Sequence, residues 1–364
     1  MKESKKILYV ITGLGGGGAE KVVVDLATRM QDIGHQVKIA YLKGEIVVKP
    51  ENDLIELINL GLESVKQAKL AYKNYKELLD RFEPDVVHAH MVHANIFARI
   101  SRKFRPINKL ICTAHNSNEG GKLRMLAYRL TNNLSDLNTN VSKEATQAFI
   151  KMQAFDDSAI TIYNGIDLNK FNRRKVDQNY LINGCDYNSF KIILAVGRFN
   201  QQKDYPNLLN AIKCLKTKTS QKFKVLIAGE GEERNKIESI IRELYLEHDV
   251  VLLGRRDDIP ELMVKADIFV LPSAYEGFGL VVAEAMACQT YVVATDCGGV
   301  KEVMGDTGIL VQPKNSLDLA QALMRAINLS DVEVIHNNMR ALKHVSKNFD
   351  LKNIVTKWLE IYAK

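Results

Sequence analysis

Short apolar runs rich in β-branched residues alternate with longer stretches of helical periodicity along almost the whole chain. The run at 7–12 is followed by a stretch at 20–30 in which apolar residues recur every three or four positions. Buried parallel strands joined by crossover helices give such an alternation. The sequence therefore predicts an α/β protein built on doubly wound parallel sheets.

Twelve runs are predicted as strands, in two groups of six. They are residues 7–12, 36–42, 54–60, 85–89, 109–114 and 137–141, and then 191–196, 223–228, 249–253, 267–271, 290–294 and 308–311. The alternation is lost in the polar stretch between the groups, and 364 residues are enough for two domains of ordinary size. We predict a first domain over 1–168, a linker and a second domain over 169–349, and a C-terminal helix over 350–364.

The composition excludes several other classes of protein. Hydrophobic residues make up 46% and charged residues 26% of the chain, which is typical of a soluble globular protein. The longest stretches without a charged residue have 13 residues, and a spanning helix needs about 20. The N-terminal apolar run has six residues, fewer than the 7–15 or so of a signal peptide. The five cysteines form no C-x-x-C pair, which favours a reducing cytoplasm over a disulfide framework or a zinc site.

A glycine loop follows the first predicted strand and matches G-x-G-x-x-G from Gly13 to Gly18. Glycines let a backbone turn tightly and approach a phosphate at a helix N-terminus. A dinucleotide site also needs an acidic residue at the end of the second strand, and residues 33–44 contain neither Asp nor Glu. This argues against a nicotinamide or flavin dehydrogenase. The loop is then either a turn without a ligand or a surface that faces a sugar, a diphosphate or an acceptor.

Two basic residues follow the first strand of the second domain. Arg198 and Lys203 lie beyond the run at 191–196, where doubly wound sheets bind their ligands. A guanidinium and an ammonium five residues apart can hold a diphosphate together; the plain alternative is two solvated cations. The loops that contain Gly229, Glu230 and Arg255 offer further close approaches to a base or a diphosphate.

Another loop carries the acidic residue Glu276, and Glu284 lies within the predicted helix that follows it. This spacing does not place two carboxylates on either side of a glycosidic bond, as hydrolysis requires. We interpret Glu276 as a ligand of sugar hydroxyls and Glu284 as a ligand of a ribose; for Glu284 alone, a helix-surface acid is the plain alternative. The backbone N–H groups of Phe278, Gly279 and Leu280, at the start of the helix, would face a diphosphate.

Several short motifs occur in order along nearly the whole chain. They are Gly16-Gly17-Gly18-Ala19-Glu20, Cys112-Thr113-Ala114-His115-Asn116, Asn140-Val141-Ser142, Tyr163-Asn164-Gly165-Ile166-Asp167, Gly197-Arg198 with Lys203, and the E-x7-E pattern of Glu276 and Glu284. With this set the chain resembles glycosyltransferase family 4, whose members are retaining enzymes of the GT-B fold. The first loop is similar to that of enzymes that build bacterial surface polysaccharides such as the O-antigen of lipopolysaccharide.

The resemblance implies two Rossmann-like domains that face each other across a cleft. The enzyme would move a hexose or N-acetylhexosamine from a nucleotide diphosphate sugar, with uracil as the base, to a glycan acceptor linked to polyprenyl diphosphate. Arg198 and Lys203 would neutralise the leaving diphosphate, His115 would contact the transferred sugar, and Gly16 and Gly17 would help to bind the donor. The last helix would cross back to the first domain.

The resemblance also implies that no metal is required. The chain contains no D-x-D sequence, which carries the metal in the other large transferase fold. Cationic side chains and a helix N-terminus would take the place of the metal, so no cofactor is expected beyond the donor substrate. His88, His90 and His93 invite a metal site, but no carboxylate or thiol is spaced to complete it.

A basic segment lies in the first domain, with eight basic residues and one acid from Arg99 to Arg129. Residues 122–130 alternate basic and apolar side chains in a pattern compatible with a helix. Basic residues near an anionic bilayer contribute about 1 kcal/mol each, and apolar neighbours can insert shallowly. We interpret the segment as docking on the inner leaflet, which would make the protein cytoplasmic and peripheral to the cell membrane. The alternative is a solvated helix with a core face. No nucleic-acid partner is expected.

Two other functions stay open from the sequence. A GT-B protein can epimerise a sugar nucleotide or phosphorolyse a glycoside, but neither the acid and base groups nor a Schiff-base lysine can be assigned here. A non-catalytic subunit that binds sugar nucleotides is disfavoured because His115, Arg198, Lys203, Glu276 and Glu284 are all present.

Overall fold

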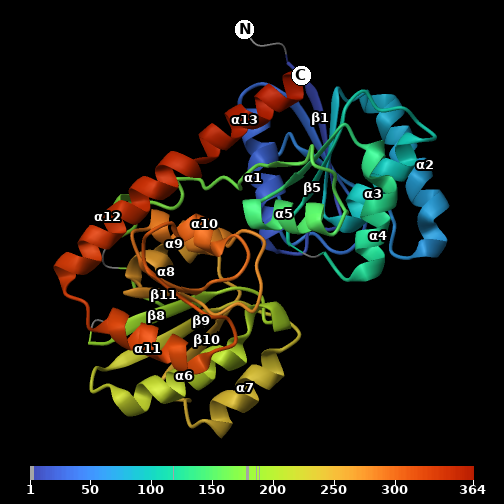
Figure 1. The fold of residues 1–364 in the computed structure, drawn as a ribbon. Coiled ribbons are helices and arrows are strands. Elements are labelled where there is room, and N and C mark those ends of the chain that lie inside the picture. The colour runs from blue at the N-terminus through green and yellow to red at the C-terminus, as the bar shows by residue number, and fades with distance from the viewer. Residues whose placement is uncertain (1–3, 118, 178–179, 186, 188) are drawn as a thin grey trace. The chain divides into compact units, whose positions relative to one another are not determined.

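The computed structural model describes residues 4–117, 119–177, 180–185, 187 and 189–364. The chain divides into two compact units: Met1–Gly165 together with Leu351–Lys364, and Ile166–Asp350. Each unit is a parallel sheet covered by helices (Figure 1).

The first unit contains a seven-stranded sheet in the order β3-β2-β1-β4-β5-β6-β7, with every pairing parallel. Its strands are β1 (Lys6–Ile11), β2 (Gln36–Tyr41), β3 (Glu56–Asn59), β4 (Val86–His90), β5 (Leu110–Ala114), β6 (Leu137–Asn140) and β7 (Ile160–Thr161). Its α-helices are α1 (Gly18–Asp32), α2 (Ala68–Phe82), α3 (Val92–Arg102), α4 (Lys122–Thr131), α5 (Lys143–Lys151) and α13 (Leu351–Ala363).

The second unit contains a six-stranded parallel sheet in the order β10-β9-β8-β11-β12-β13. Its strands are β8 (Lys191–Val196), β9 (Phe223–Ala228), β10 (Val250–Gly254), β11 (Ile268–Leu271), β12 (Tyr291–Thr295) and β13 (Ile309–Val311). Its α-helices are α6 (Tyr205–Lys218), α7 (Arg234–Glu243), α8 (Ile259–Lys265), α9 (Leu280–Ala287), α10 (Val300–Met304), α11 (Ser316–Ile327) and α12 (Asp331–Asn348).

The strands agree closely with those predicted from the sequence. All twelve predicted strands are present, with ends shifted by at most two residues. Strand β7 was missed because it has only two residues and therefore leaves no apolar run. The prediction of an α/β protein with two doubly wound parallel sheets is confirmed.

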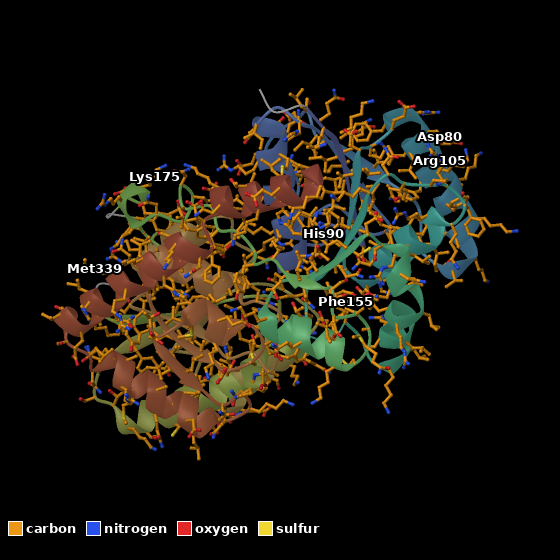
Figure 2. The ribbon with its side chains drawn as sticks, turned by 45° about the horizontal axis from the view of Figure 1, so that its top comes forward. Asp80, His90, Arg105, Phe155, Lys175 and Met339 are labelled. Atoms are coloured by element: carbon orange, nitrogen blue, oxygen red, sulfur yellow. The ribbon has the colours of Figure 1, made fainter. Side chains whose placement is uncertain are left out.

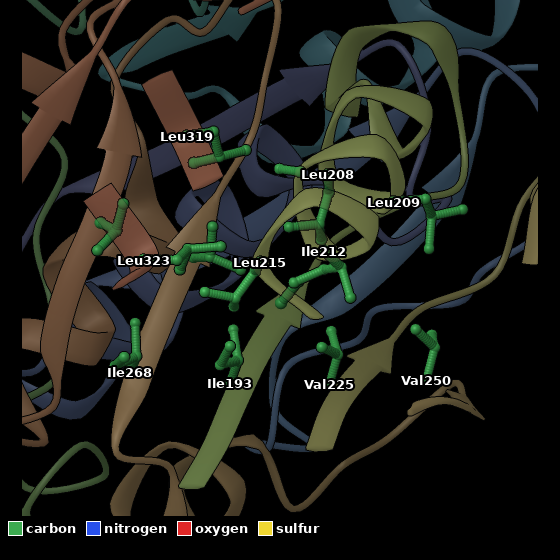
Figure 3. Packing of buried hydrophobic residues seen from close by; sticks show 14 of the residues in the cluster. Ile193, Leu208, Leu209, Ile212, Leu215, Val225, Val250, Ile268, Leu319 and Leu323 are labelled. Atoms are coloured by element: carbon green, nitrogen blue, oxygen red, sulfur yellow. The ribbon is translucent and has the colours of Figure 1, made fainter. Parts of the chain in front are cut away.

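Each unit has its own apolar core. In the second unit, Ile193, Val225 and Ile268 of the sheet pack against α6 and α11 through residues such as Ile212 and Leu323 (Figure 3). Burying a side chain of this size stabilises the fold by about 1.5–3 kcal/mol.

The C-terminal helix belongs to the core of the first unit. Ile354 and Trp358 of α13 are 2% and 4% exposed, and they share one apolar cluster with Tyr9 of β1 and Val23 of α1. The tyrosine hydroxyls of Tyr9 and Tyr362 lie 3.2 Å apart in this core. The end of the chain thus completes the apolar face of a sheet that begins at residue 6.

Strand order reverses once in each sheet, between β1 and β4 and between β8 and β11. In open α/β sheets the loops at this reversal diverge, and ligands bind at the carboxyl ends of the strands there. The loops that follow β8 and β11, and those that follow β1 and β4, are therefore the expected positions of a binding site.

Candidate active site

The loops after β8 and β11 carry Lys203 and Glu276. Lys203 ends a 3₁₀ turn (Gln201–Lys203) after β8, and Glu276 lies between β11 and α9. The ammonium of Lys203 donates to Oε1 of Glu276 at 2.5 Å, and the two side chains are 15% and 9% exposed. The structure therefore joins two predicted site residues in a largely buried ion pair at the reversal of strand order.

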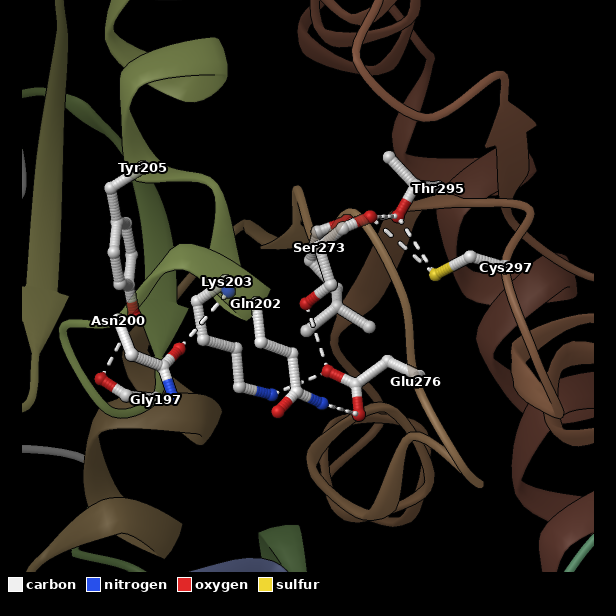
Figure 4. Close-up of polar contacts among 10 residues, drawn as sticks. Gly197, Asn200, Gln202, Lys203, Tyr205, Ser273, Glu276, Thr295 and Cys297 are labelled. Atoms are coloured by element: carbon white, nitrogen blue, oxygen red, sulfur yellow. Dashed lines mark hydrogen bonds and ion pairs between the residues drawn. The ribbon is translucent and has the colours of Figure 1, made fainter. Parts of the chain in front are cut away.

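Two further donors hold the carboxylate of Glu276 (Figure 4). The hydroxyl of buried Ser273 donates to Oε1 at 2.8 Å, and the amide of Gln202 donates to Oε2 at 3.4 Å. A carboxylate has about four acceptor positions and an ammonium has three donors. Both groups are thus fixed in orientation while they keep hydrogen-bonding capacity for a ligand. The sequence analysis assigned no role to Ser273, although it lies three residues before Glu276 in the same loop, or to Gln202, which only the fold brings to Glu276.

The backbone at Glu276 is packed against a glycine that the sequence motifs did not single out. Gly298 has a φ of +54°, and a Cβ at this position would lie 1.8 Å from the carbonyl oxygen of Glu276. Only glycine fits such an approach without moving the neighbouring backbone. The loop after β12 thus helps to determine where Glu276 lies.

The loops after β8 and β9 also meet through glycines. Gly229 has a φ of +156°, and a Cβ there would lie 1.9 Å from the carbonyl oxygen of Gly197. The same oxygen accepts a hydrogen bond from Tyr205 at 3.0 Å (Figure 4). Gly229 therefore has a packing role within this edge of the sheet, and its contact with a donor stays a prediction.

Three charged residues predicted to bind the donor lie on the same edge. Arg198 follows β8 and Arg255 follows β10, and both are exposed. Glu230 follows β9 and forms an ion pair with Arg234 at the start of α7. Arg198 and Arg255 are thus accessible from solvent, whereas the carboxylate of Glu230 already has a cationic partner.

Helix α9 follows Gly279, which has a φ of +85°. Phe278 is buried and packs edge-on against Phe349, and Leu280 is the first residue of the helix. Glu284 is 3% exposed in a helix whose other buried residues are apolar. Because Glu284 is buried, the alternative of a helix-surface acid is wrong. Burying a carboxylate is costly unless polar groups surround it.

In the first unit, the glycine loop leads directly into α1. Gly16 has a φ of +87° and Gly17 is the N-cap of the helix. A Cβ on Gly17 would lie 2.5 Å from Oε2 of Glu20, which is 8% exposed. The carboxylate of Glu20 therefore lies beside the loop at the positive end of α1. Donor binding by Gly16 and Gly17 stays a prediction.

The ends of β4 and β5 bring three histidines together. The ring centroids of His88 and His90 lie 4.0 Å apart, and Nδ1 of His90 lies 3.0 Å from Nε2 of His115. Both nitrogens of His88 are bonded at 2.7 Å, to the hydroxyls of Tyr362 and Thr113. His90, Thr113 and His115 also line a pocket of about 10 Å³, room for about one water molecule.

Burial keeps these imidazoles neutral. Desolvation lowers the pKa of His115 to about 4, and it holds the pKa values of His88 and His90 well below the usual range. In the described part of the chain, the histidine, cysteine and acidic side chains form no group of three suited to a metal.

A carboxylate holds the loop that follows His115. Glu119 accepts from the backbone N–H of His115 at 2.7 Å and from the hydroxyl of Tyr128 at 2.6 Å. Burial raises the pKa of Glu119 to about 7. From the sequence, Glu119 counted only as the single acid of a basic segment, because its partners are defined by the fold.

The basic segment from Arg99 to Arg129 needs a correction. Arg99 is fully buried, where it donates to the carbonyl of Tyr128 and to Asn138. Arg102 pairs with Asp136, and Arg105 pairs with Asp80 at 2.7 Å (Figure 2). These arginines therefore form internal contacts, and the exposed basic face is reduced to Lys103 and the basic residues of α4: Lys122, Arg124 and Arg129.

Two family models match the chain. The model described as Glycosyltransferase Family 4 matches residues 16–170, and the model described as Glycosyl transferases group 1 matches residues 186–341. The first lies mostly in the first unit and the second lies within the second unit.

Curated relatives extend over most of the chain. The N-acetyl-alpha-D-glucosaminyl L-malate synthase of Bacillus anthracis is 29% identical over 300 residues, which are 79% of this chain and 76% of that protein. The N-acetylgalactosamine-N,N'-diacetylbacillosaminyl-diphospho-undecaprenol 4-alpha-N-acetylgalactosaminyltransferase of Campylobacter jejuni is 27% identical over 371 residues, which are 95% and 96% of the two chains.

A solved structure shows the same fold. Alr3699/HepE of Anabaena, crystallised in complex with UDP, has a TM-score of 0.80 and 22% identity, and the match covers 98% of this chain and 99% of that one. The fold is therefore GT-B, with two Rossmann-like domains of seven and six strands. Together with the two family models, this places the chain in the family of glycosyltransferases whose domains those models describe.

Proposed function

We propose that the protein transfers a hexose or N-acetylhexosamine from a UDP-sugar to a glycan acceptor linked to polyprenyl diphosphate, in the assembly of a surface polysaccharide. The buried pair of Lys203 and Glu276, at the reversal of strand order and just before α9, carries this proposal. Two relatives support its finer points. The Campylobacter jejuni protein is named for a diphospho-undecaprenol acceptor, and the Anabaena protein was crystallised with UDP.

In the proposed reaction, the bond between the anomeric carbon and the diphosphate breaks while an acceptor hydroxyl attacks from the same face. The hydroxyl proton passes to the leaving diphosphate, and the anomeric configuration is retained. Lys203, Arg198 and the N–H groups at the start of α9 stabilise the diphosphate, which is the kind of electrostatic effect that contributes most to many enzymes. These positive groups do the work for which other transferases use a metal.

The other predicted residues orient the two parts of the donor. Glu276 accepts hydrogen bonds from hydroxyls of the transferred sugar, and Ser273 and Gln202 hold its carboxylate for that purpose. Glu284 binds the ribose from within α9. His115 contacts the transferred sugar from the first unit.

Nucleotide binding is the first test of this function. UDP at about a hundred times its dissociation constant is expected to raise the free energy of unfolding by about 2.7 kcal/mol, as a shift of the thermal transition that a chelator does not change. GDP, ADP and NAD at equal concentration serve as controls and should give smaller shifts. A shift with NAD alone, or a UDP shift that disappears with chelator, would contradict the proposed donor site.

We further propose that α4 docks on an anionic bilayer, which would bring the protein to its lipid-linked acceptor at the inner face of the membrane. Leu123, Leu126 and Leu130 of α4 are 83%, 47% and 71% exposed, and they recur at helical spacing. Arg124 and Arg129 lie among them and are also exposed. Exposed leucines can insert shallowly into a bilayer, while the basic side chains beside them are attracted to anionic headgroups. No described helix is both long enough and apolar enough to cross a bilayer.

Charge reversal on α4 is expected to weaken this docking. The double variant Arg124→Glu/Arg129→Glu should lose most of its co-sedimentation with anionic vesicles and most of its activity on a lipid acceptor, while it keeps its hydrolysis of the donor. The control is Lys343→Glu/Lys347→Glu, which makes the same charge change on exposed residues of α12. Equal effects of the two double variants, or an equal loss of transfer and hydrolysis, would contradict docking through α4.

A further inference from the structure

The imidazole of His90 lies beside His115. His90 is the last residue of β4 and is 1% exposed, and β4 pairs with β5, which ends directly before His115. Nδ1 of His90 lies 3.0 Å from Nε2 of His115, whereas Nε2 of His90 is buried without a hydrogen-bond partner among the described residues. The ring of His90 is thus bonded on one side only, and that bond is to the predicted site histidine.

Two neutral imidazoles that share a hydrogen bond have coupled tautomers, because one ring must donate and the other must accept. If His115 donated, the proton of His90 would lie on Nε2, as a buried N–H without a partner among the described residues. If His90 donates from Nδ1, its Nε2 is left as an unfilled acceptor. For the backbone of folded proteins, buried N–H groups without partners are rarer than acceptors that are not fully satisfied, and an imidazole N–H loses its hydrogen bond to water on burial in the same way. The second arrangement is therefore favoured.

We propose that His90 is a positioning residue that fixes the tautomer of His115. The bond from Nδ1–H of His90 to Nε2 of His115 keeps the proton of His115 on Nδ1. His115 then offers a hydrogen-bond donor at Nδ1, and the bond to His90 holds its ring in one orientation. This inference deepens the proposed function, since it states what His115 presents to the transferred sugar: a neutral N–H for one of its oxygens.

The neighbouring histidine shows why this role falls to His90. His88 lies two residues earlier on β4, and both of its ring nitrogens are bonded to hydroxyls, those of Tyr362 and Thr113. His88 is thus a buried imidazole on the same strand that forms no hydrogen bond with His115. His88 therefore supplies a matched control for effects of core packing.

The tautomer can be measured directly, without substrate. Ring ¹⁵N spectra of the full chain near pH 7 should show a pyrrole-type Nδ1 and a pyridine-type Nε2 for His115. In His90→Leu the signals should move toward the opposite tautomer, and His90→Asn, whose amide can donate from near the Nδ1 position, should restore them. An Nε2–H tautomer in the unmodified protein would overturn the proposal. An unchanged spectrum in His90→Leu, or an equal change in His88→Gln, would also overturn it.

Kinetics then connect the tautomer to the proposed function. His90→Leu should lower kcat by about 10- to 100-fold, by analogy with the loss of groups that orient metal-binding histidines, while UDP affinity stays the same and His90→Asn recovers most of the rate. A loss of UDP affinity equal to the loss of kcat would overturn the positioning role. If the spectra behave as expected but no UDP-sugar is used, the proposed function fails and the assignment of the tautomer stands.

Discussion

Replacing Lys203 with methionine is expected to lower kcat by about 10²- to 10³-fold, as does the loss of one group that stabilises developing charge in other enzymes. The ammonium would no longer meet the negative charge that grows on the leaving diphosphate. The same change leaves the buried carboxylate of Glu276 without its cationic partner, which is also destabilising. Steady-state rates alone would therefore mix a catalytic effect with a structural one.

A double-variant cycle separates the two effects. Glu276→Gln combined with Lys203→Met removes both charges, so the free energy of unfolding should recover relative to Lys203→Met alone. Activity should not recover, because the diphosphate still lacks its cation. Recovery of activity together with stability would mean that the pair is structural, and it would contradict the proposed role of Lys203.

The same strand offers a matched control. Lys191, at the other end of β8, forms an ion pair with Asp267 at 2.9 Å, and these side chains are about one third exposed. Lys191→Met removes a lysine from an ion pair of the same sheet, far along the strand from the predicted diphosphate site. We expect less than a twofold change in kcat for this variant.

Most of the fold could be predicted from the sequence because buried parallel strands give continuous apolar runs. This rule fails for short edge strands: β7 consists of Ile160 and Thr161, and neither is fully buried. The loops were predictable for a similar reason, since strand ends and glycines locate the edge of the sheet at which a ligand binds.

The candidate site was predictable only in part. Lys203 and Glu276 lie in short motifs, so their residue types and spacing in the sequence are enough to indicate a role. Gly298 and His90 act through contacts with residues far away in the sequence, and their neighbours along the chain carry no sign of these contacts. Residues that hold a site residue in place are therefore harder to find from one sequence than the site residues themselves.

The basic segment shows an error of a different kind. The number of basic residues led to the prediction that Arg99 lies on a surface. Arg99 follows Val92 and Asn95 at helical spacing, and all three are buried. The guanidinium is accepted in the interior because a carbonyl, a threonine hydroxyl and Asn138 receive its hydrogen bonds. Helical periodicity would have separated Arg99 from the exposed residues of α4, and charge counting could not.

The buried histidines predict that acid destabilises the first unit. Below pH 6.5 an unfolded histidine binds a proton, whereas His88, His90 and His115 stay neutral in the folded chain because burial lowers their pKa values, that of His115 to about 4. Unfolding therefore takes up about three protons from these histidines once the pH falls below about 6.5. Glu119 opposes this, because its folded pKa of about 7 exceeds its unfolded value of 4.5, so unfolding releases one proton. For these four groups together, the net uptake of two protons lowers the free energy of unfolding by about 2.7 kcal/mol for each unit of falling pH, and the lowered pKa of His93 acts in the same direction.

Trp358 provides the measurement, since it is the only tryptophan of the sequence and its ring lies 4.4 Å from that of His88. Urea unfolding followed by its fluorescence at pH 7, 6 and 5 should give the slope of stability against pH. His88→Gln removes one of the three histidines and should reduce the slope to about 1.4 kcal/mol per unit. Glu119→Gln removes the opposing carboxyl and should raise it to about 4.1. His248→Gln, at an exposed position of the second unit, should leave it unchanged. A stability that is constant or that rises as the pH falls from 6.5 to 5 would show that these histidines are protonated in the folded chain, and the neutral pair of His90 and His115 would then have to be abandoned.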